Sequence, residues 1–190
     1  QGMPEVAWGR IHGEKEWTAL LSLHNAQFDL LQRTPEVARS RATPLLDLIS
    51  EALVSNESTE NHYGIKLPVS LLFIAGHDTN LANLSGVFDL NWSLPGQPDN
   101  TPPGGELVFE RWTRVSDNTD WIQISFVYQT LQQMREFKPF SSSSLPNKIV
   151  LTLPSCQDKN PEGMCPLKHF IDIVQTARIT QCAVMADVNR

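Results

Sequence analysis

The sequence of this 190-residue chain predicts an α/β fold, and three observations support it. Residues 14–33 and 36–53 repeat apolar side chains at three- and four-residue steps, which is typical of amphipathic helices. Residues 69–75 form a continuous apolar run that ends at a glycine, which suits a strand buried on both faces of a sheet. Residues 106–115 and 121–130 alternate loosely around a polar turn, which indicates a β-hairpin.

The first helix carries one apolar face, on which we expect His24 to be partly buried with its polar atoms satisfied. The residues of this face are Trp17, Leu20, Leu21, His24, Phe28 and Leu31. The second helix is expected to begin at Thr34-Pro35-Glu36, with Thr34 as the cap. Because Thr43-Pro44 repeats this pattern, the helix is predicted to kink or restart at Pro44.

The remaining elements follow from local composition. Residues 54–67 are polar and predict a loop, and residues 95–105, rich in Pro and Gly, predict a second, irregular one. Short helices are expected at 81–88 and 166–177, and one more strand at 149–153.

Charge and hydropathy exclude several classes of function. Lys and Arg total 15 against 21 Asp and Glu, and the net charge of -6 argues against a general nucleic-acid binder. A local arginine cluster around a small anion remains possible in such a chain. The longest strongly apolar run is far shorter than the roughly 20 residues of a membrane span. No metal-binding motif is present, so we expect no bound metal. From the charge and the short apolar run, we expect neither nucleic acid nor a membrane as a partner.

Gly76, His77 and Asp78 form the sharpest chemical feature. A predicted buried strand runs into a glycine, and two ionisable residues follow at the predicted start of a helix. Free backbone N–H groups and the helix dipole make such a point a natural anion site. A His there can donate to an anionic oxygen, and an Asp can deliver a proton. The alternative is that Asp78 or Thr79 only caps the helix and His77 only fills space.

Arg33, Arg39 and Arg41 fall within nine residues of a mostly acidic protein. Arginine suits phosphate because its planar fork binds two oxygens at once. The alternative is a solvated helix face with ion pairs to Glu36 or Asp47. Since Arg39 and Arg41 lie about 200° apart on a helix, at most one of them is expected to face a single ligand.

The cysteine count is odd. Cys156 and Cys165 bracket a turn, and they either form a disulfide that closes a short loop or remain free thiols. Cys182 is left over, which suggests a partner elsewhere or a free thiol. The chain also starts without an initiator Met and shows no signal peptide, so we expect processing or a piece of something longer.

Gly76-His77-Asp78-Thr79-Asn80 resembles the second signature of the histidine acid phosphatases. Residues 21–28, 31–49 and 91–112 are similar to bacterial periplasmic phytases, enzymes that remove phosphate from inositol hexakisphosphate. The first family signature, RHGxRxP, carries the histidine that becomes phosphorylated, and this chain contains no RHG. The resemblance therefore implies the C-terminal part of the enzyme. Its nucleophile would lie on a missing N-terminal part, separated by proteolytic nicking or by expression as a fragment.

The resemblance implies a two-domain histidine phosphatase fold, which is phosphoglycerate-mutase-like, with the active site between the domains. Residues 1–66 would be part of the helical domain and the return to the sheet. Residues 67–190 would be the C-terminal part of the α/β domain, which carries the His-Asp motif.

The resemblance also implies individual roles. Asp78 would be the general acid that protonates the leaving oxygen, and His77 would hydrogen-bond the transferred phosphate. Thr79 would lie on the same substrate loop, and Arg41 would contact a substrate phosphate. Arg39 matches no family contact and is expected at the surface or in an ion pair. No cofactor is implied.

Cys156 and Cys165 match a local family disulfide, and Cys182 matches a cysteine whose partner lies upstream, outside this chain. Disulfides fit an oxidising periplasm. The expected function is thus hydrolysis of phytate through a phosphohistidine intermediate. The rivals are a broader acid phosphatase or glucose-1-phosphatase of the same family, and a non-catalytic module that binds phosphate ligands.

Overall fold

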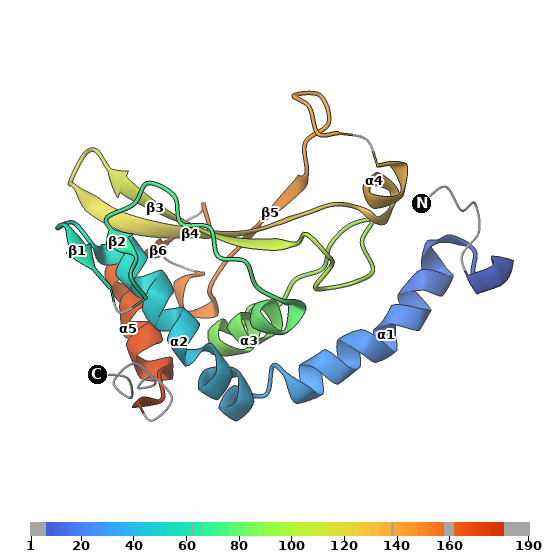
Figure 1. Ribbon diagram of the computed structural model, residues 1–190, viewed down its shortest axis with the longest axis horizontal. Coiled ribbons are helices and arrows are strands. Elements are labelled where there is room, and N and C mark those ends of the chain that lie inside the picture. Colours follow the sequence, from blue (N-terminus) through green and yellow to red (C-terminus); the bar gives the residue numbers. More distant parts are fainter. Residues whose placement is uncertain (1–6, 62, 138, 158–161, 181–190) are drawn as a thin grey trace.

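The structure is a computed structural model that describes residues 7–61, 63–137, 139–157 and 162–180. Its centre is an antiparallel sheet in the order β3-β4-β5 (Figure 1). The strands are β3 (Glu106–Arg114), β4 (Thr119–Tyr128) and β5 (Asn147–Leu151). The short β6 (Cys165–Pro166) also pairs with β4. The predicted hairpin is therefore confirmed, with β3 and β4 paired along their whole length.

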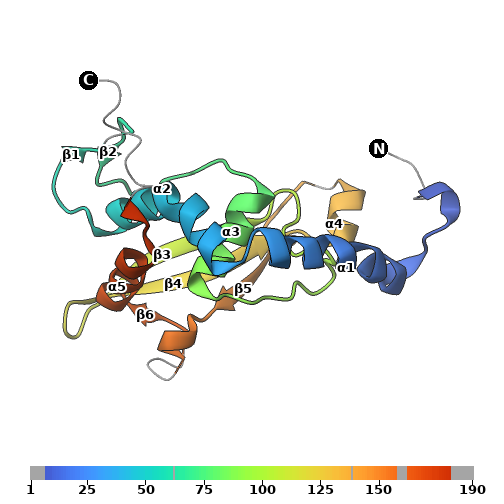
Figure 2. The same cartoon turned by 90° about the horizontal axis from the view of Figure 1, so that it is seen from below.

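Three helices cover one face of this sheet, and a fourth extends away from it (Figures 1 and 2). The covering helices are α2 (Pro35–Val54), α3 (Asp78–Phe88) and α5 (Leu167–Ala177). Helix α1 (Gly13–Leu31) projects beyond the end of the sheet, and α4 (Leu131–Glu136) follows β4. Single 3₁₀ turns occupy Ala7–Gly9 and Pro154–Cys156. None of the described helices is both long and apolar enough to cross a lipid bilayer.

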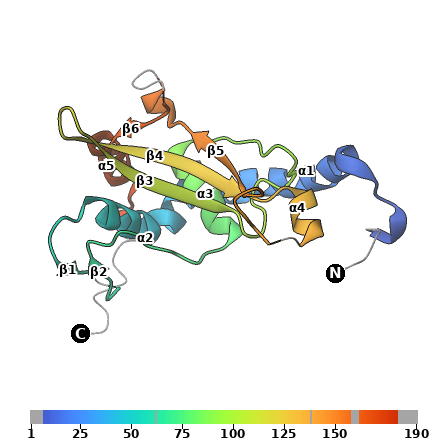
Figure 3. The same ribbon diagram turned by 90° about the horizontal axis from the view of Figure 1, so that it is seen from above.

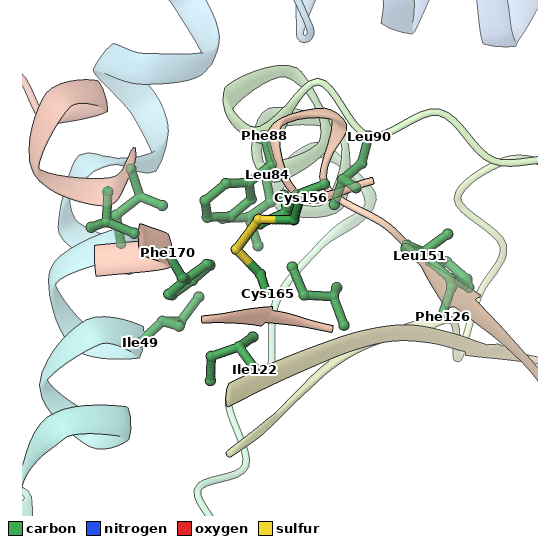
Figure 4. Close-up of a cluster of buried hydrophobic side chains, with 14 of the residues drawn as sticks. Ile49, Leu84, Phe88, Leu90, Ile122, Phe126, Leu151, Cys156, Cys165 and Phe170 are labelled. Carbon is green, nitrogen blue, oxygen red and sulfur yellow. A yellow bond between two sulfur atoms is a disulfide. The ribbon is translucent and has the colours of Figure 1, made fainter. Parts of the chain in front are cut away.

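The core lies between the sheet and the covering helices (Figure 4). Phe170 of α5 is fully buried, and its ring centroid lies 5.3 Å from that of Phe88 on α3. The three-residue and four-residue spacing of Phe170, Val174 and Ala177 puts them on one face, and all three are buried. Other fully buried side chains come from α2 and β4: Leu46, Ile122, Ile124 and Phe126. The sheet as seen from above lies across these helices (Figure 3).

The predicted buried strand at 69–75 is wrong. Residues 68–77 form neither a helix nor a strand. Several of their apolar side chains are exposed: Val69, Leu71, Phe73 and Ile74. A strand needs backbone partners at its edges, and no described strand pairs with this segment. The apolar pattern was correctly identified, but the part of the chain that the structure describes does not bury it.

Three further expectations about the helices and loops need correction. Helix α2 continues through Pro44, so the predicted restart is wrong, whereas the alternative of a kink at Pro44 stays a prediction. Packing on α3 and α5 offsets the one hydrogen bond that proline cannot make. Thr34 occupies the N-cap position of α2, as predicted, but its side chain makes no capping hydrogen bond, because the hydroxyl donates to the Leu30 carbonyl at the end of α1. The loop predicted at 54–67 contains a small hairpin, formed by β1 (Thr59–Glu60) and β2 (Lys66–Leu67).

The apolar face predicted for α1 is only partly covered by the described residues. No residue of α1 is buried, and Leu20 and Leu31 are about half exposed. Only α3 makes substantial contact with α1 among the described elements. Both α1 and residues 68–77 therefore present apolar surface that the described residues do not bury.

Candidate active site

A groove with a volume of about 1410 Å³ runs between the unpaired segment 68–77 and strand β3. Helix α2 contributes apolar side chains to it, and residues 101–105 close one end. One edge of β3 is hydrogen-bonded to β4, whereas the other edge has no described strand beside it. The groove is therefore bounded by two extended stretches of backbone whose hydrogen-bonding groups are open for pairing.

His77 and Asp78 lie where the extended segment enters α3. Asp78 is the first residue of the helix, His77 precedes it, and both are exposed and line the groove. Asp78 Oδ1 accepts the Thr79 backbone N–H at 2.7 Å. The structure thus brings the two predicted residues together at a helix N-terminus that opens on a groove. Such a point favours an anion because of its free N–H groups and the helix dipole.

The turn that carries this pair is tied by Asn80. The His77 N–H donates to Asn80 Oδ1 at 2.8 Å, and the Asn80 N–H donates to the His77 carbonyl at 3.0 Å. Asn80 also lines the groove. Sequence reasoning assigned no role to this residue, although a polar side chain three residues after a helix cap is a known signature.

His24 and Asp99 face the same groove from elsewhere in the chain. His24 Nε2 lies 3.8 Å from Asp99 Oδ1, and the neighbouring Asn25 donates to the Pro98 carbonyl at 3.1 Å. His24 is half-buried, as expected, and its ring centroid lies 4.3 Å from that of Phe28. Its pairing with Asp99 was missed, because no local signal relates residues 75 positions apart.

Thr79 and Arg41 are not among the described residues that line the groove. Arg41 is exposed on α2, and its guanidinium donates to Gln32 Oε1. Arg39 behaves differently from the expected surface position or ion pair. Its guanidinium donates to the carbonyls of Ala177 and Thr176 at 2.8 and 3.0 Å, and so satisfies the last turn of α5.

Cys156 and Cys165 form a disulfide in the core, as the sequence predicted (Figure 4). Together with His169 they are the described residues whose ligand atoms lie close enough to hold a metal. Both sulfurs are engaged in the disulfide, so neither is a thiolate that a soft metal would need. Cys182 lies outside the described residues.

The sequence matches known proteins over most of its length. A model of the histidine phosphatase superfamily (branch 2) matches residues 8–127. Phytase AppA of Escherichia coli (strain K12) is 64% identical over 184 residues, which cover 97% of this chain and 43% of that protein. A glucose-1-phosphatase of Salmonella typhimurium is 36% identical over 177 residues, covering 92% of this chain and 40% of that protein.

Solved structures agree with these matches. The phytase from Citrobacter braakii superposes with a TM-score of 0.91 at 72% identity, covering 96% of this chain and 46% of that one. Hafnia alvei phytase in complex with myo-inositol hexakis sulphate gives a TM-score of 0.84 at 46% identity. The match covers 95% of this chain and 45% of that one. This chain therefore spans less than half the length of the relatives that it matches.

Proposed function

This chain belongs to branch 2 of the histidine phosphatase superfamily and has its fold, and from this premise we propose that it is the C-terminal part of a phytase. The whole enzyme would remove phosphate from inositol hexakisphosphate through a phosphohistidine intermediate. The observation that carries the proposal is the His77–Asp78 pair at the start of α3, facing a large groove. The similarity to phytases, one of them solved with a hexakis sulphate, supports the substrate.

Asp78 would act as the general acid. When a histidine of the N-terminal part attacks phosphorus, the bond to the inositol oxygen breaks, and that oxygen takes a proton from the Asp78 carboxyl group. Water would then attack the phosphohistidine and give a proton to the Asp78 carboxylate. A new P–O bond forms, the P–N bond breaks, and inorganic phosphate and the free histidine are released. The exposed carboxylate at the mouth of the groove supports this role, because both the leaving oxygen and water can reach it.

His77 would donate a hydrogen bond to the phosphoryl group in transfer, and Thr79 would lie on the same substrate-contacting loop. The N-terminus of α3 adds a favourable field for the developing negative charge. Arg41 would contact a more distant phosphate of the substrate. This role requires the guanidinium to leave Gln32, its partner in the structure.

The N-terminal part, with its RHGxRxP signature, would occupy the groove between segment 68–77 and β3 and leave the His77–Asp78 turn open to the substrate. Segment 68–77 and the free edge of β3 both offer unpaired backbone, and exposed apolar side chains such as Leu71 and Phe73 lie along the first of them. An inserted strand would pair with these edges and bury that surface. Under this proposal residues 1–66 contribute to a helical domain and residues 67–190 to an α/β domain, with the active site between them.

Cys182 would link this chain covalently to the N-terminal part. The Cys156–Cys165 disulfide fits an oxidising compartment, and we extend this to the periplasm. Non-reducing electrophoresis of the native protein should show one large species that separates into two on reduction. A Cys182 that is free, or bonded to Cys156 or Cys165, would contradict the covalent link.

The decisive experiment compares the chain alone with the chain joined to an RHG-containing N-terminal part. We expect no phosphatase activity from the chain alone and turnover of phytate by the joined protein. Hydrolysis of phytate without an RHG-containing polypeptide, which mass spectrometry would detect, would overturn the proposal. A joined protein that binds phosphate without turnover would instead identify a binding module.

The second candidate is a glucose-1-phosphatase, favoured by the similarity to such enzymes. Comparing kcat/KM for phytate and for glucose 1-phosphate on the joined protein distinguishes the two. A clear preference for glucose 1-phosphate would replace phytate as the proposed substrate.

A further inference from the structure

The backbone of His77 is held by one side chain. Residues 68–76 make no hydrogen bond in the described part of the structure, so no strand partner fixes the direction in which the chain reaches α3. The His77 N–H, the next donor along the chain, bonds to Asn80 Oδ1 at 2.8 Å. The return bond from the Asn80 N–H to the His77 carbonyl closes a small ring around Asp78 and Thr79. The contact of Asp78 with the Thr79 N–H and a longer bond from the Leu81 N–H to the His77 carbonyl, at 3.4 Å, complete the described contacts of the turn.

Gly76 leaves room for this side chain. A Cβ atom at position 76 would lie 3.0 Å from Asn80 Oδ1 and 3.5 Å from Asn80 Cγ. The first of these contacts is tighter than ordinary van der Waals packing, so a larger residue would push Asn80 away from the His77 N–H. Gly76 has no positive φ angle, and hence its small size, not its conformational freedom, is what the turn uses here.

We propose that Asn80 is a positioning residue, which acts through the His77 backbone to direct the His77 and Asp78 side chains into the groove. This role rests on the function proposed above for His77 and Asp78. A helix cap would stabilise α3 wherever those side chains pointed. Asn80, however, binds the N–H of the residue that carries one of the two functional side chains, and among the described contacts it is the side chain that holds this N–H.

Two variants separate the acceptor oxygen from side-chain volume. Asn80→Asp keeps an oxygen in place of Oδ1, whereas Asn80→Leu has nearly the same shape and no acceptor. In the isolated chain, Asn80→Leu should speed hydrogen exchange of the His77 amide by about tenfold, and Asn80→Asp should leave it near the wild-type rate. Equal exchange rates in wild type and Asn80→Leu would overturn the geometric basis of the proposal.

Activity is tested in the protein joined to its N-terminal part. Asn80→Leu should lower kcat on phytate by about 10²-fold, because displaced catalytic groups lose alignment. The loss should be smaller on an aryl phosphate, whose leaving group needs less help from Asp78. Asn80→Asp should recover most of the kcat but raise KM, since its carboxylate lies near an anionic substrate. Gly76→Ala should lower kcat in the same direction but by less, because the added Cβ displaces Asn80 Oδ1 only slightly.

A purely structural cap predicts a different result. The loss of kcat in Asn80→Leu would then equal the loss of folded protein and would be the same on both substrates, which overturns the positioning role. If the wild-type joined protein hydrolyses neither substrate, the proposed function fails, whereas the amide-exchange result still decides the geometry around Asn80.

Discussion

Asp78 is the single residue on which the proposed chemistry depends most. It is exposed, begins α3, and shares the groove with His77. An inositol alkoxide is a poor leaving group, so its departure requires a proton, whereas an aryl oxide leaves without much assistance. The role of Asp78 can therefore be tested by comparing the loss of kcat on substrates with these two kinds of leaving group.

Asp78→Asn in the joined protein should reduce kcat on phytate by roughly 10²–10⁴-fold, the usual contribution of a general acid. The reduction should be much smaller on an aryl phosphate, and binding of inorganic phosphate should persist. Steady-state kinetics on both substrates provide the measurement. An equal reduction on the two substrates would argue against the acid role.

Arg41→Ala should raise KM for phytate more than KM for a simple phosphomonoester, because only the polyanion extends to a second cationic contact. Arg39→Ala is the matched control. It removes the bonds to Ala177 and Thr176 at the end of α5, and should therefore lower stability without changing KM. If Arg41→Ala leaves KM for phytate unchanged, Arg41 has no place in the site.

At the scale of the elements, α3 is held against the junction of α1 and α2 by a close approach. A Cβ atom at Gly86 would lie 2.5 Å from the Arg33 carbonyl oxygen and 2.9 Å from Ala38 Cβ. The Arg33 guanidinium binds Leu90 and Asn91, just beyond the C-terminal end of α3. Because the obstructing atoms are largely backbone, the neighbours cannot yield without moving a helix.

Gly86→Ala should destabilise the fold by roughly 1–3 kcal/mol, the usual cost of overpacking. This cost outweighs the gain of about 1 kcal/mol that alanine normally brings to a helix interior. Urea unfolding followed by circular dichroism measures the difference. An unchanged or raised stability would show that α3 can move outward freely.

The β3–β4 hairpin contains a carboxylate with an altered pKa. The Thr113 hydroxyl, and next the Arg111 guanidinium, hold the pKa of Asp120 below its ordinary value of 3.8. Asp120 binds these groups at 2.6 and 2.7 Å. A carboxylate with a lower pKa in the folded state stabilises the fold above its unfolded pKa. This contribution disappears as the pH falls through the folded value.

Asp120→Asn should therefore lower the melting temperature near pH 7, and the difference from wild type should disappear as the pH falls below 3.8. Thermal unfolding across this range is the measurement. Glu57→Gln, in the exposed loop before β1, serves as the control and should show no such pH dependence. A difference that stays constant down to strongly acidic pH would exclude the ionised carboxylate as its cause.

At the scale of the whole molecule, the main feature is an apolar surface that the described residues leave exposed. Among the described residues, segment 68–77 exposes apolar side chains, one edge of β3 has no strand beside it, and α1 has no fully buried residue. Relatives that contain this region are more than twice as long as the chain. Burial of this surface is thus expected to drive association with the N-terminal part.

Leu71→Lys and Phe73→Lys should weaken that association, since each would place a charge on the surface of segment 68–77 that the inserted strand would bury. The two side chains are 85% and 75% exposed in this chain, so its own fold should tolerate the changes. Co-purification with a separately tagged N-terminal part provides the measurement. Val115→Lys, at the 99% exposed tip of the hairpin, should associate normally. Full association of both groove variants would exclude this surface as the interface.

Local patterns in the sequence predicted the helices α1, α2, α3 and α5, the β3–β4 hairpin and the position of the His-Asp pair before a helix. The periodicity of residues 166–177 predicted α5 with its buried face, because helical periodicity depends on near neighbours alone. The short strand β6 and helix α4 were not predicted. Two-residue pairing and a six-residue helix carry too little periodic signal to recognise.

The sequence by itself thus determined which segments are amphipathic, which cysteines lie close enough to pair, and that the His77–Asp78 pair precedes a helix. Only the tertiary structure decided which apolar segments are buried, as the exposed run at 69–75 shows. It also decided that His24 meets Asp99 and that Arg39 serves the end of α5. The physical reason is that helical periodicity and turns arise from neighbours in sequence, whereas strand pairing and burial require partners that only the folded chain, or another part of the protein, brings into contact.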